Sequence, residues 1–357
     1  MVIAEYCNYA ANYAGNFIKS LQSMESYTKE NDPDSQVIYI LPQFAASLQW
    51  AKDLSRTNVV IFMPKYGRLK TNLKLIGYCK HYHIDILHSH FHGLSSIFLI
   101  GYFTKTKVIS HFHNTIDQIS FGKKILYRIL GLKVSYFVGC SKAVYDTLRN
   151  IGLSLQRTTY ITNCIDFSRL DNYSTSTEPF DKNKTNLLIL GSDFYRKGVD
   201  ATLKAIEPIQ EVNNICLNII THNTQQTQNL IKKVLGYQAE WVKIVQPTEY
   251  IGDYYRNSAI FLSPSLAEGF CYAVHEALYC KCMVIKTDIP AMTYGLCHED
   301  FITIPSQKEL KEKIESTLKM DYNYRDELIL SLRNQVIKKY DVKKWGEEMY
   351  YLYKNLS

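Results

Sequence analysis

The stretch AIFLSPSLAEGFCYAVHEALY, residues 259–279, predicts a strand, a loop and a helix in succession. Its first residues, Ala259–Ser263, are apolar like a buried strand, and Tyr272–Tyr279 carries apolar residues at helical spacing. Glu268 lies in the loop and Glu276 on the helix. A strand that runs into a helix is the repeating unit of a parallel α/β sheet.

The same alternation extends along the chain in both directions. The remaining predicted strands are Gln36–Leu41, Asn58–Met63, Asp85–His90, Lys107–His111, Tyr136–Cys140, Leu187–Leu190, Ile215–Thr221, Val242–Val245 and Cys282–Lys286. Predicted helices include Gly15–Tyr27, Leu69–His81, Lys142–Ile151, Lys197–Ile209, Thr227–Leu235 and Thr248–Asn257. Because the strands are apolar and rich in β-branched residues, they favour parallel sheets that are covered by helices on both faces.

A polar segment, residues 171–186, divides the chain into two α/β halves. It has no apolar periodicity, so we expect a linker between Rossmann-like domains at 1–170 and 187–335. Residues 336–357 are predicted to form a final helical segment. Two such domains are expected to leave a cleft between the carboxyl ends of their sheets, where open α/β sheets bind ligands.

Composition limits the class of protein. The chain has 357 residues, 46% hydrophobic and 21% charged, which is typical of a globular protein of two domains and excludes a disordered one. The N-terminus does not resemble a secretory leader, and the most apolar run, Leu94–Phe103, is shorter than the roughly 20 residues of a membrane span. Nine cysteines without CxxC pairs suggest a reducing compartment, so we expect a cytoplasmic protein.

Positive charge is concentrated in the first half. Residues 1–175 carry 19 Lys and Arg against 11 Asp and Glu, a net +8, whereas the remainder carries 22 against 23, a net −1. A basic half is expected to face a membrane surface, a phosphorylated acceptor or nucleic acid. Nucleic acid is the least expected of these partners, because the sequence has none of the usual nucleic-acid motifs.

One segment of that half, residues 119–133, could lie on an anionic membrane. Its apolar residues fall on one helical stripe, and its basic residues surround the stripe. The stripe comprises Phe121, Ile125, Leu126, Ile129 and Leu130, and the basic residues are Lys123, Lys124, Arg128 and Lys133. The interpretation that the pattern slightly favours is an ordinary helix whose stripe packs against the sheet.

A second strand-to-helix junction, LILGSDFYRKGVD at residues 188–200, suits a diphosphate. Gly191 allows a turn, and a helix is expected to begin near Lys197. A helix N-terminus attracts anions, and Arg196 and Lys197 add two full charges. The alternative is a solvated basic helix start.

Glu268 and Glu276 suit a different part of a ligand. Carboxylates accept hydrogen bonds, and sugars and riboses present hydroxyl donors. Gly269 leaves the neighbouring backbone amides open to close approach. Without further context, a surface pair of glutamates would be the simpler interpretation.

Taken together, Lys197-Gly198 and Glu268-x7-Glu276, with Gly-Phe after the first Glu, resemble the signature of the retaining GT-B glycosyltransferases of family GT4. Further matching stretches are His88-Ser89-His90, Lys107–Asn114, Ser141-Lys142-Ala143 and Ile161–Asp166, and the resemblance covers most of residues 75–290. It implies the GT-B fold, in which two Rossmann-like domains border a cleft and a C-terminal helix crosses back to the first domain.

The resemblance also implies roles for individual residues. Arg196 and Lys197 would bind the donor diphosphate, and Glu276 would hold the ribose hydroxyls. Glu268 would contact the transferred sugar near the amides of Gly269 and Phe270.

Other assignments lie elsewhere in the chain. His113 would lie against the reacting sugar, and Gly15 would lie in a loop near the phosphates. Ser192 stands where the family often has Arg. The remaining histidines of these strands, His88, His90 and His111, are predicted to be structural rather than catalytic.

We therefore expect a retaining hexosyltransferase that moves a sugar from a nucleotide sugar, with UDP as the default nucleotide, to a glycan or lipid-linked saccharide. Capsule, exopolysaccharide or lipopolysaccharide synthesis is the expected setting. No cofactor and no metal are expected, because fixed cations can stabilise the leaving diphosphate. The D-x-D motif Asp32-Pro33-Asp34 is predicted to be a turn. The alternatives are a non-catalytic GT-B subunit that supports a partner enzyme and a nucleotide-sugar epimerase.

Overall fold

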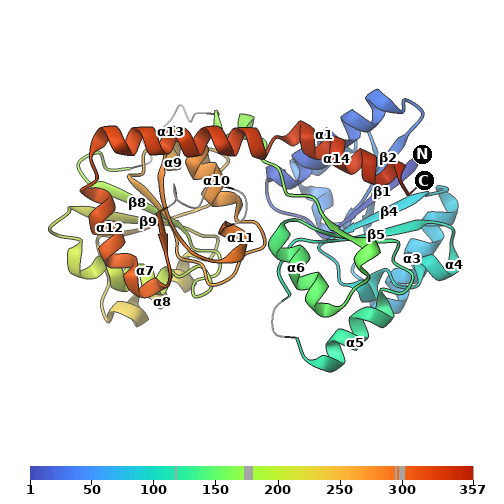
Figure 1. Ribbon diagram of the computed structural model, residues 1–357, viewed down its shortest axis with the longest axis horizontal. Helices are drawn as coiled ribbons and strands as arrows, with labels where there is room; N and C mark the ends of the chain where they lie inside the picture. The colour runs from blue at the N-terminus through green and yellow to red at the C-terminus, as the bar shows by residue number, and fades with distance from the viewer. Residues whose placement is uncertain (117–118, 173–179, 294–295, 297–301, 357) are drawn as a thin grey trace. The chain divides into compact units, whose positions relative to one another are not determined.

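The computed structural model describes residues 1–116, 119–172, 180–293, 296 and 302–356 of the chain (Figure 1). The chain forms two compact units. The first contains Met1–Ile165 together with Tyr340–Ser357, and the second contains Asp166–Lys339. Each unit is built around its own parallel sheet, so the prediction of two Rossmann-like domains is confirmed.

The first unit holds a seven-stranded parallel sheet in the order β3-β2-β1-β4-β5-β6-β7. Its strands are β1 (Val2–Cys7), β2 (Gln36–Pro42), β3 (Val59–Met63), β4 (Ile86–His90), β5 (Lys107–Phe112), β6 (Tyr136–Gly139) and β7 (Thr158–Tyr160). The sequence patterns predict five of these strands and miss β1 and β7. The charged Glu5 interrupts the apolar run of β1, and β7 has only three residues.

Helices cover this sheet. They are α1 (Gly15–Asn31), α2 (Gln49–Leu54), α3 (Arg68–His81), α4 (Ile100–Phe103), α5 (Phe121–Leu130), α6 (Lys142–Ile151) and the C-terminal α14 (Val342–Lys354). α14 packs along α1, although the two lie at opposite ends of the sequence (Figure 1). Gly346 makes the close approach possible, because a Cβ atom there would meet the backbone oxygen of Ser23 at 3.0 Å. Leu21, Met24 and Met349 are buried in the core that the two helices share with the sheet.

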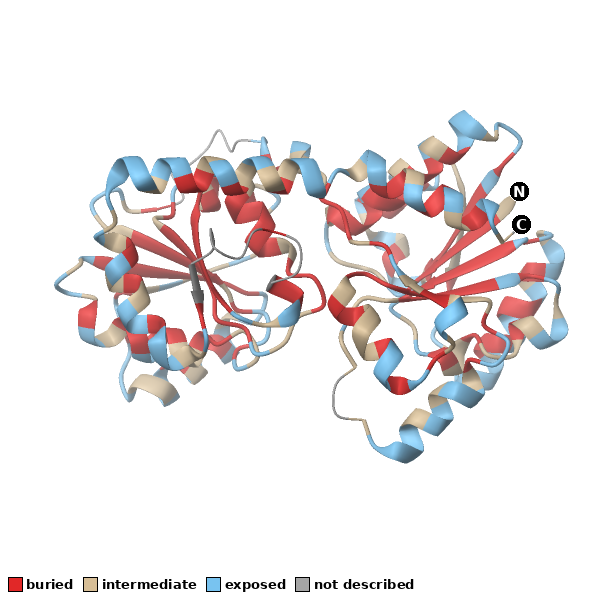
Figure 2. Cartoon of the chain, in the orientation of Figure 1, coloured by how far each residue is buried: buried red, intermediate tan, exposed pale blue. Residues whose placement is uncertain are grey.

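The second unit holds a six-stranded parallel sheet in the order β10-β9-β8-β11-β12-β13. Its strands are β8 (Thr185–Leu190), β9 (Ile215–Ile220), β10 (Val242–Val245), β11 (Ile260–Ser263), β12 (Met283–Thr287) and β13 (Ile302–Ile304). The helices are α7 (Val199–Ile206), α8 (Thr224–Leu235), α9 (Ile251–Arg256), α10 (Tyr272–Tyr279), α11 (Pro290–Thr293), α12 (Leu310–Leu318) and α13 (Tyr322–Lys339). Figure 2 shows that the strands of both sheets are mostly buried, as expected for apolar parallel strands.

The boundaries between the units differ from the predicted ones. Residues 166–170, expected in the first domain, belong to the second unit, because the Arg256 guanidinium donates to the Leu170 carbonyl oxygen at 2.6 Å and the Phe167 ring stacks on Tyr279. The expected linker, 171–186, ends earlier than predicted, since β8 begins at Thr185; residues 173–179 lie outside the described residues. Residues 336–339 end α13 in the second unit, so the segment returning to the first begins at Tyr340.

Three further features belong to the described part of the chain. None of its helices combines the length and the apolarity that crossing a membrane requires. Its eight cysteines are buried and free of disulfides. Asp32, Pro33 and Asp34 lie in the turn between α1 and β2, as predicted.

Candidate active site

Each sheet has one place where the strand order reverses direction. In the first unit this switch point lies between β1 and β4, and in the second it lies between β8 and β11. Open α/β sheets bind ligands outside the carboxyl ends of the strands at such a point. Most of the predicted site residues follow strands at or next to these two points.

In the second unit, the switch point brings Lys197 and Glu268 together. The Lys197 ammonium lies 2.6 Å from Oε1 of Glu268, and the Arg196 guanidinium lies 3.5 Å from the same oxygen. The side chains of Lys197 and Glu268 are only 17% and 10% exposed, so water screens their attraction weakly. Arg196, whose side chain is 41% exposed, also pairs through Nε with Oδ2 of Asp193 at 2.9 Å, so two cations and two carboxylates meet at the end of β8 and β11.

The backbone fixes this arrangement. Leu266 N–H donates to the Arg196 carbonyl oxygen at 2.8 Å, and the Arg196 guanidinium donates to the Ala267 carbonyl oxygen at 2.9 Å. Gly198 has a φ of 72°, and a Cβ atom there would lie 2.5 Å from the Pro264 oxygen. Glycine is therefore required where the turn after β8 meets the loop after β11.

Gly198 also explains why α7 begins two residues after Lys197, near which its start was predicted. α7 begins at Val199 rather than near Lys197, because the left-handed Gly198 occupies its N-cap. Arg196 and Lys197 consequently lie in the turn before the helix. Ser192, immediately after Gly191, is exposed on the same turn.

Glu276 lies on α10 and is held by two residues that the sequence analysis did not identify. Its carboxylate forms a salt bridge with the Arg169 guanidinium and accepts a hydrogen bond from the Tyr255 hydroxyl at 3.3 Å. Burial, followed by the negative charge of Glu276, raises the pKa of Tyr255, which therefore keeps its proton. Arg169 precedes α10 by a hundred residues and more, and no local pattern connects them.

Gly269 and Phe270 complete the loop that leads into α10. Both are buried, and the Phe270 ring stacks on His275 with the ring centroids 4.9 Å apart. Burial lowers the pKa of His275 to about 3, so this ring is neutral. Cys271, in the left-handed region at a φ of 62°, then caps the helix. The stacking of Phe270 and the cap at Cys271 thus hold the loop backbone that follows Glu268.

In the first unit, the predicted His113 ends a row of buried polar side chains. Strand register pairs Glu5 with His88 and His90 with His111, and side chains two residues apart share one face of a strand. His90 Nε2 lies 2.9 Å from Oε2 of Glu5, and His90 Nδ1 lies 3.0 Å from Nε2 of His113. His113 follows β5 and is joined through His90 to a carboxylate on β1.

A second arm of the same network reaches the C-terminal helix. The Tyr353 hydroxyl, on α14, donates to Oε1 of Glu5 at 2.8 Å. His88 Nδ1 lies 2.6 Å from that hydroxyl oxygen, and His111 Nδ1 lies 3.2 Å from His88 Nε2. The prediction that His88, His90 and His111 are structural is consistent with this burial, although His90 also contacts His113.

Burial keeps the imidazoles of His90, His111 and His113 neutral. It lowers the pKa of His90 and His111 well below the ordinary value, with neighbouring histidines adding to the effect. Burial lowers the pKa of His113 to about 3, although His113 keeps part of its surface exposed. At neutral pH, His113 can accept a proton or share its own, but it carries no charge.

The network also contains groups that could hold a metal ion. Among the described residues, the ligand atoms of His88, His90 and His111 lie within 4.8 Å of one another, as do those of Glu5, Cys7 and His90. Neutral imidazole nitrogens are suitable zinc ligands. Metal independence therefore needs an experimental test.

Gly15 lies at the same switch point, as the first residue of α1 in the segment after β1. Its φ is 59°, and a Cβ atom there would meet the Tyr9 hydroxyl at 2.8 Å. That hydroxyl donates to the Ala14 carbonyl oxygen at 3.0 Å. The segment that leads into α1 therefore depends on glycine at this position.

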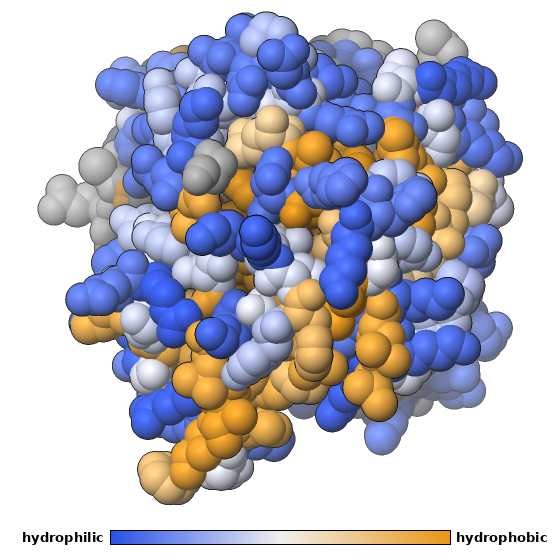
Figure 3. All heavy atoms as spheres, turned by 90° about the vertical axis from the view of Figure 1, so that its right-hand side faces the viewer, coloured by the Kyte–Doolittle hydropathy of each residue, from blue (hydrophilic) through white to orange (hydrophobic). Residues whose placement is uncertain are grey.

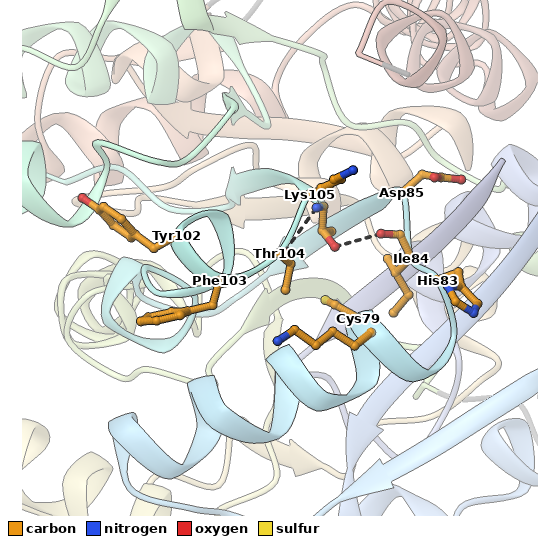
Figure 4. Close-up of a pocket in the computed structure, with 10 residues that line it drawn as sticks. Cys79, His83, Ile84, Asp85, Tyr102, Phe103, Thr104 and Lys105 are labelled. Carbon is orange, nitrogen blue, oxygen red and sulfur yellow. Dashed lines mark hydrogen bonds between the residues drawn. The ribbon is translucent and has the colours of Figure 1, made fainter.

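A cavity of about 760 Å³ lies elsewhere on the first unit, around the segments that precede β4 and β5 (Figure 4). Its lining includes His83, Asp85, Tyr102, Phe103 and Lys105. These residues lie at the amino ends of the strands, whereas Glu5, His90 and His113 lie toward the carboxyl ends. The cavity is thus separate from the predicted site.

Comparison with protein families matches both halves of the chain. Residues 33–169 match the model described as Glycosyltransferase Family 4, and residues 174–335 match the one described as Glycosyl transferases group 1. No curated protein matches the chain in sequence.

Solved structures share the fold over the full chain. A glycosyltransferase from Rickettsia africae is 17% identical, with a TM-score of 0.82 over 99% of this chain and 98% of its own. Anabaena Alr3699/HepE in complex with UDP-glucose is 13% identical, with a TM-score of 0.77 over 99% of this chain and 100% of its own. Sucrose-phosphate synthase from Thermosynechococcus elongatus is 15% identical, with a TM-score of 0.78 over 100% of this chain and 99% of its own. At such identities the likeness shows the fold.

Proposed function

Because the chain is a glycosyltransferase of the family 4 type with a GT-B fold, we propose that it is a retaining, metal-independent hexosyltransferase that uses a UDP-sugar. The observation that supports this donor is the cluster of Arg196, Lys197 and Glu268 at the switch point of the second sheet. The similar Anabaena protein binds UDP-glucose, which supports UDP as the nucleotide.

The residues of the cluster suit different parts of the donor. Breaking the bond between the anomeric carbon and the phosphate oxygen leaves negative charge on the diphosphate, and Lys197 and Arg196 would stabilise that charge. Glu268, now paired with Lys197, would accept hydrogen bonds from sugar hydroxyls once phosphate oxygens take over the ammonium. Glu276 would hold the ribose, with Arg169 and Tyr255 fixing its carboxylate.

Retention of configuration then needs no protein nucleophile. The acceptor hydroxyl attacks the anomeric carbon from the face that the diphosphate leaves. A new bond forms between that carbon and the acceptor oxygen, and the acceptor proton passes to the leaving phosphate. In this proposal His113, assigned by the family resemblance, contacts the reacting sugar.

The proposed acceptor is a glycan or lipid-linked saccharide of a cell-surface polysaccharide. A screen of UDP, GDP and ADP sugars, with and without oligosaccharide acceptors, tests the assignment, and the anomeric configuration of the product tests retention. We expect slow hydrolysis or transfer from a UDP-hexose. Conversion of the donor into an isomer without acceptor would indicate an epimerase, and no turnover with any donor would favour a non-catalytic subunit.

We further propose that α5 docks on an anionic membrane. The expectation that its apolar stripe packs on the sheet is wrong, because no residue of α5 is buried. Phe121 is 75% exposed and Ile129 is 55% exposed. Apolar side chains gather at the lower edge of the face in Figure 3, where α5 lies. The exposed Lys123 and the half-buried Lys124 beside this stripe complement anionic headgroups.

Vesicle co-sedimentation tests this docking. Each lysine near an anionic surface contributes about 1 kcal/mol, so Lys123→Glu with Lys124→Glu should weaken binding strongly, and high salt should weaken wild-type binding. Arg128 is left unchanged because its guanidinium donates to the Ile151 carbonyl oxygen. Lys232→Glu with Lys233→Glu, on exposed positions of α8, is the matched control. Equal recovery with neutral and anionic vesicles would remove the membrane proposal.

A further inference from the structure

The buried network of the first unit has only a few consistent arrangements of its protons. Besides His113, the network has five polar members that are fully or almost fully buried: Glu5, His88, His90, His111 and Tyr353. The network is therefore screened from bulk solvent, and its members form hydrogen bonds with one another. Each hydrogen bond must have one proton, and a neutral imidazole has one N–H and one bare nitrogen.

The assignment starts at Tyr353. The Tyr353 hydroxyl donates its proton to Oε1 of Glu5 at 2.8 Å. Glu5 accepts as a carboxylate, and its other oxygen faces His90 Nε2 at 2.9 Å. The proton of that bond must come from His90, which leaves His90 Nδ1 bare.

The next bond follows from this one. His90 Nδ1 has no proton, so it accepts from Nε2–H of His113 at 3.0 Å. We propose that Glu5, acting through His90, positions His113 in the tautomer that carries its proton on Nε2 and presents a bare Nδ1. Such a nitrogen accepts a hydrogen bond from a sugar or acceptor hydroxyl, and it is not a proton donor. This role rests on the proposed function of His113.

The other arm agrees independently. The Tyr353 proton is used on Glu5, so His88 must donate from Nδ1 to the tyrosine oxygen at 2.6 Å. When Nδ1–H is the only ring proton of His88, its Nε2 is bare and accepts from Nδ1–H of His111 at 3.2 Å. His111 Nε2 should therefore carry no proton, and it is a buried nitrogen without a hydrogen-bond partner. A bare nitrogen accounts for this isolation without burying an unsatisfied N–H.

The C-terminal helix has a role in this scheme. Tyr353 lies on α14 and accounts for one of the two hydrogen bonds that identify Glu5 as an acceptor. Glu5, His90 and Tyr353 are thus positioning residues, and His113 is the group that would touch the substrate. A carboxylate that holds a histidine in one tautomer is a general device of histidine catalysis.

Nitrogen NMR of histidine-labelled protein reads this proton directly. Chemical shifts distinguish protonated from bare imidazole nitrogens, and His113→Gln identifies the His113 signals by their loss. We expect a protonated Nε2 and a bare Nδ1 in the wild-type protein at pH 7. A protonated Nδ1 would overturn the proposal before any variant is made. So would a stoichiometric metal ion on His88, His90 and His111, because metal ligation would replace these hydrogen bonds.

Glu5→Gln tests the cause. We expect the glutamine oxygen to keep accepting from Tyr353, so that its amide donates to His90 Nε2, which moves the His90 proton to Nδ1 and the His113 proton from Nε2 to Nδ1. We expect the His113 shifts to exchange and kcat with the UDP-sugar to fall roughly 10- to 100-fold, the usual range for removing such a supporting hydrogen bond.

Glu25→Gln is the matched control. Glu25 is a buried carboxylate of the same unit that accepts from the Tyr39 hydroxyl at 2.8 Å and pairs with Lys29. This variant should leave the His113 tautomer and kcat unchanged. A Glu5→Gln protein with the wild-type tautomer would contradict the proposed cause, and an exchanged tautomer with unchanged kcat would contradict its catalytic importance. If the tautomer exchanges but no sugar donor is ever turned over, the proposed function fails while the proton assignment stands.

Discussion

The two units present opposite kinds of chemistry at equivalent places in their sheets. At the switch point of the second sheet, Arg196, Lys197 and Glu268 carry formal charges and are partly exposed. At the switch point of the first sheet, His90 and His111 are buried and neutral. The second arrangement suits an anion that brings its own charge. The first suits the orientation of a single hydrogen bond, since burial suppresses any charge on the rings.

The largest difference between the units should appear in acid. A histidine whose pKa is lowered by folding binds fewer protons when folded than when unfolded, so its stabilising effect is complete above about pH 6.5 and is lost as the pH falls below that value. In the first unit, burial lowers the pKa of His92 to about 4 and of His113 to about 3, and lowers those of His90 and His111. Each lowered pKa unit corresponds to about 1.4 kcal/mol.

Hydrogen exchange at pH 7 and pH 5, corrected for intrinsic rates, measures this loss peptide by peptide. Peptides from β4 and β5 should lose more protection than those from β8 and β9. The second unit has His275 as a comparable buried histidine, which gives it a smaller response. Equal losses in the two sheets would show that the buried histidines do not control acid stability.

Lys197→Ala should give the largest effect on catalysis. It removes a fixed cation from the leaving diphosphate, so kcat/KM should fall by about two decades, or about 2.7 kcal/mol. Lys204→Ala, at an exposed position of α7, is the control and should behave as wild type. An unchanged kcat/KM in the Lys197 variant would remove the proposed donor site.

Glu276→Ala should act mainly on nucleotide binding. Loss of the carboxylate removes the proposed ribose contact and leaves Arg169 without this partner, so the Kd for UDP should rise roughly tenfold, or about 1.4 kcal/mol. Calorimetric titration with UDP measures the change, and Glu312→Ala, exposed on α12, is the control. Unaltered affinity for UDP would argue against the ribose assignment.

Chelation should give the smallest effect. The fixed cations of the second unit take the place of a metal at the diphosphate, so turnover in excess EDTA should equal turnover without it. Loss of activity that Mn²⁺ or Mg²⁺ restores would indicate a metal at the donor. Loss that only Zn²⁺ restores would point instead to the His88, His90 and His111 group.

The sequence alone predicts most of the secondary structure. It also predicts the charged residues of the candidate site in the second unit, Arg196, Lys197, Glu268 and Glu276. α6, α10 and β10 have the predicted bounds, because local apolar periodicity specifies them. Lys197 and Glu268 were identifiable because each lies in a short motif next to its own strand. Glu5 could have been found by its position between Ile3 and Cys7 on one face of an otherwise apolar strand. That signal was too weak to use, since a single acidic residue normally indicates exposure.

Only the tertiary structure determines which of these residues meet. Strand order places β1 beside β4 and β8 beside β11, and this order brings Glu5 to His90 and Lys197 to Glu268. Arg169 and Tyr353 reach the site regions from segments remote in sequence, and the exposure of α5 depends on what the rest of its unit covers. Apolar periodicity specifies which face of an element is buried. It does not specify the neighbour across that face, because any apolar surface of suitable shape satisfies the same hydrophobic requirement.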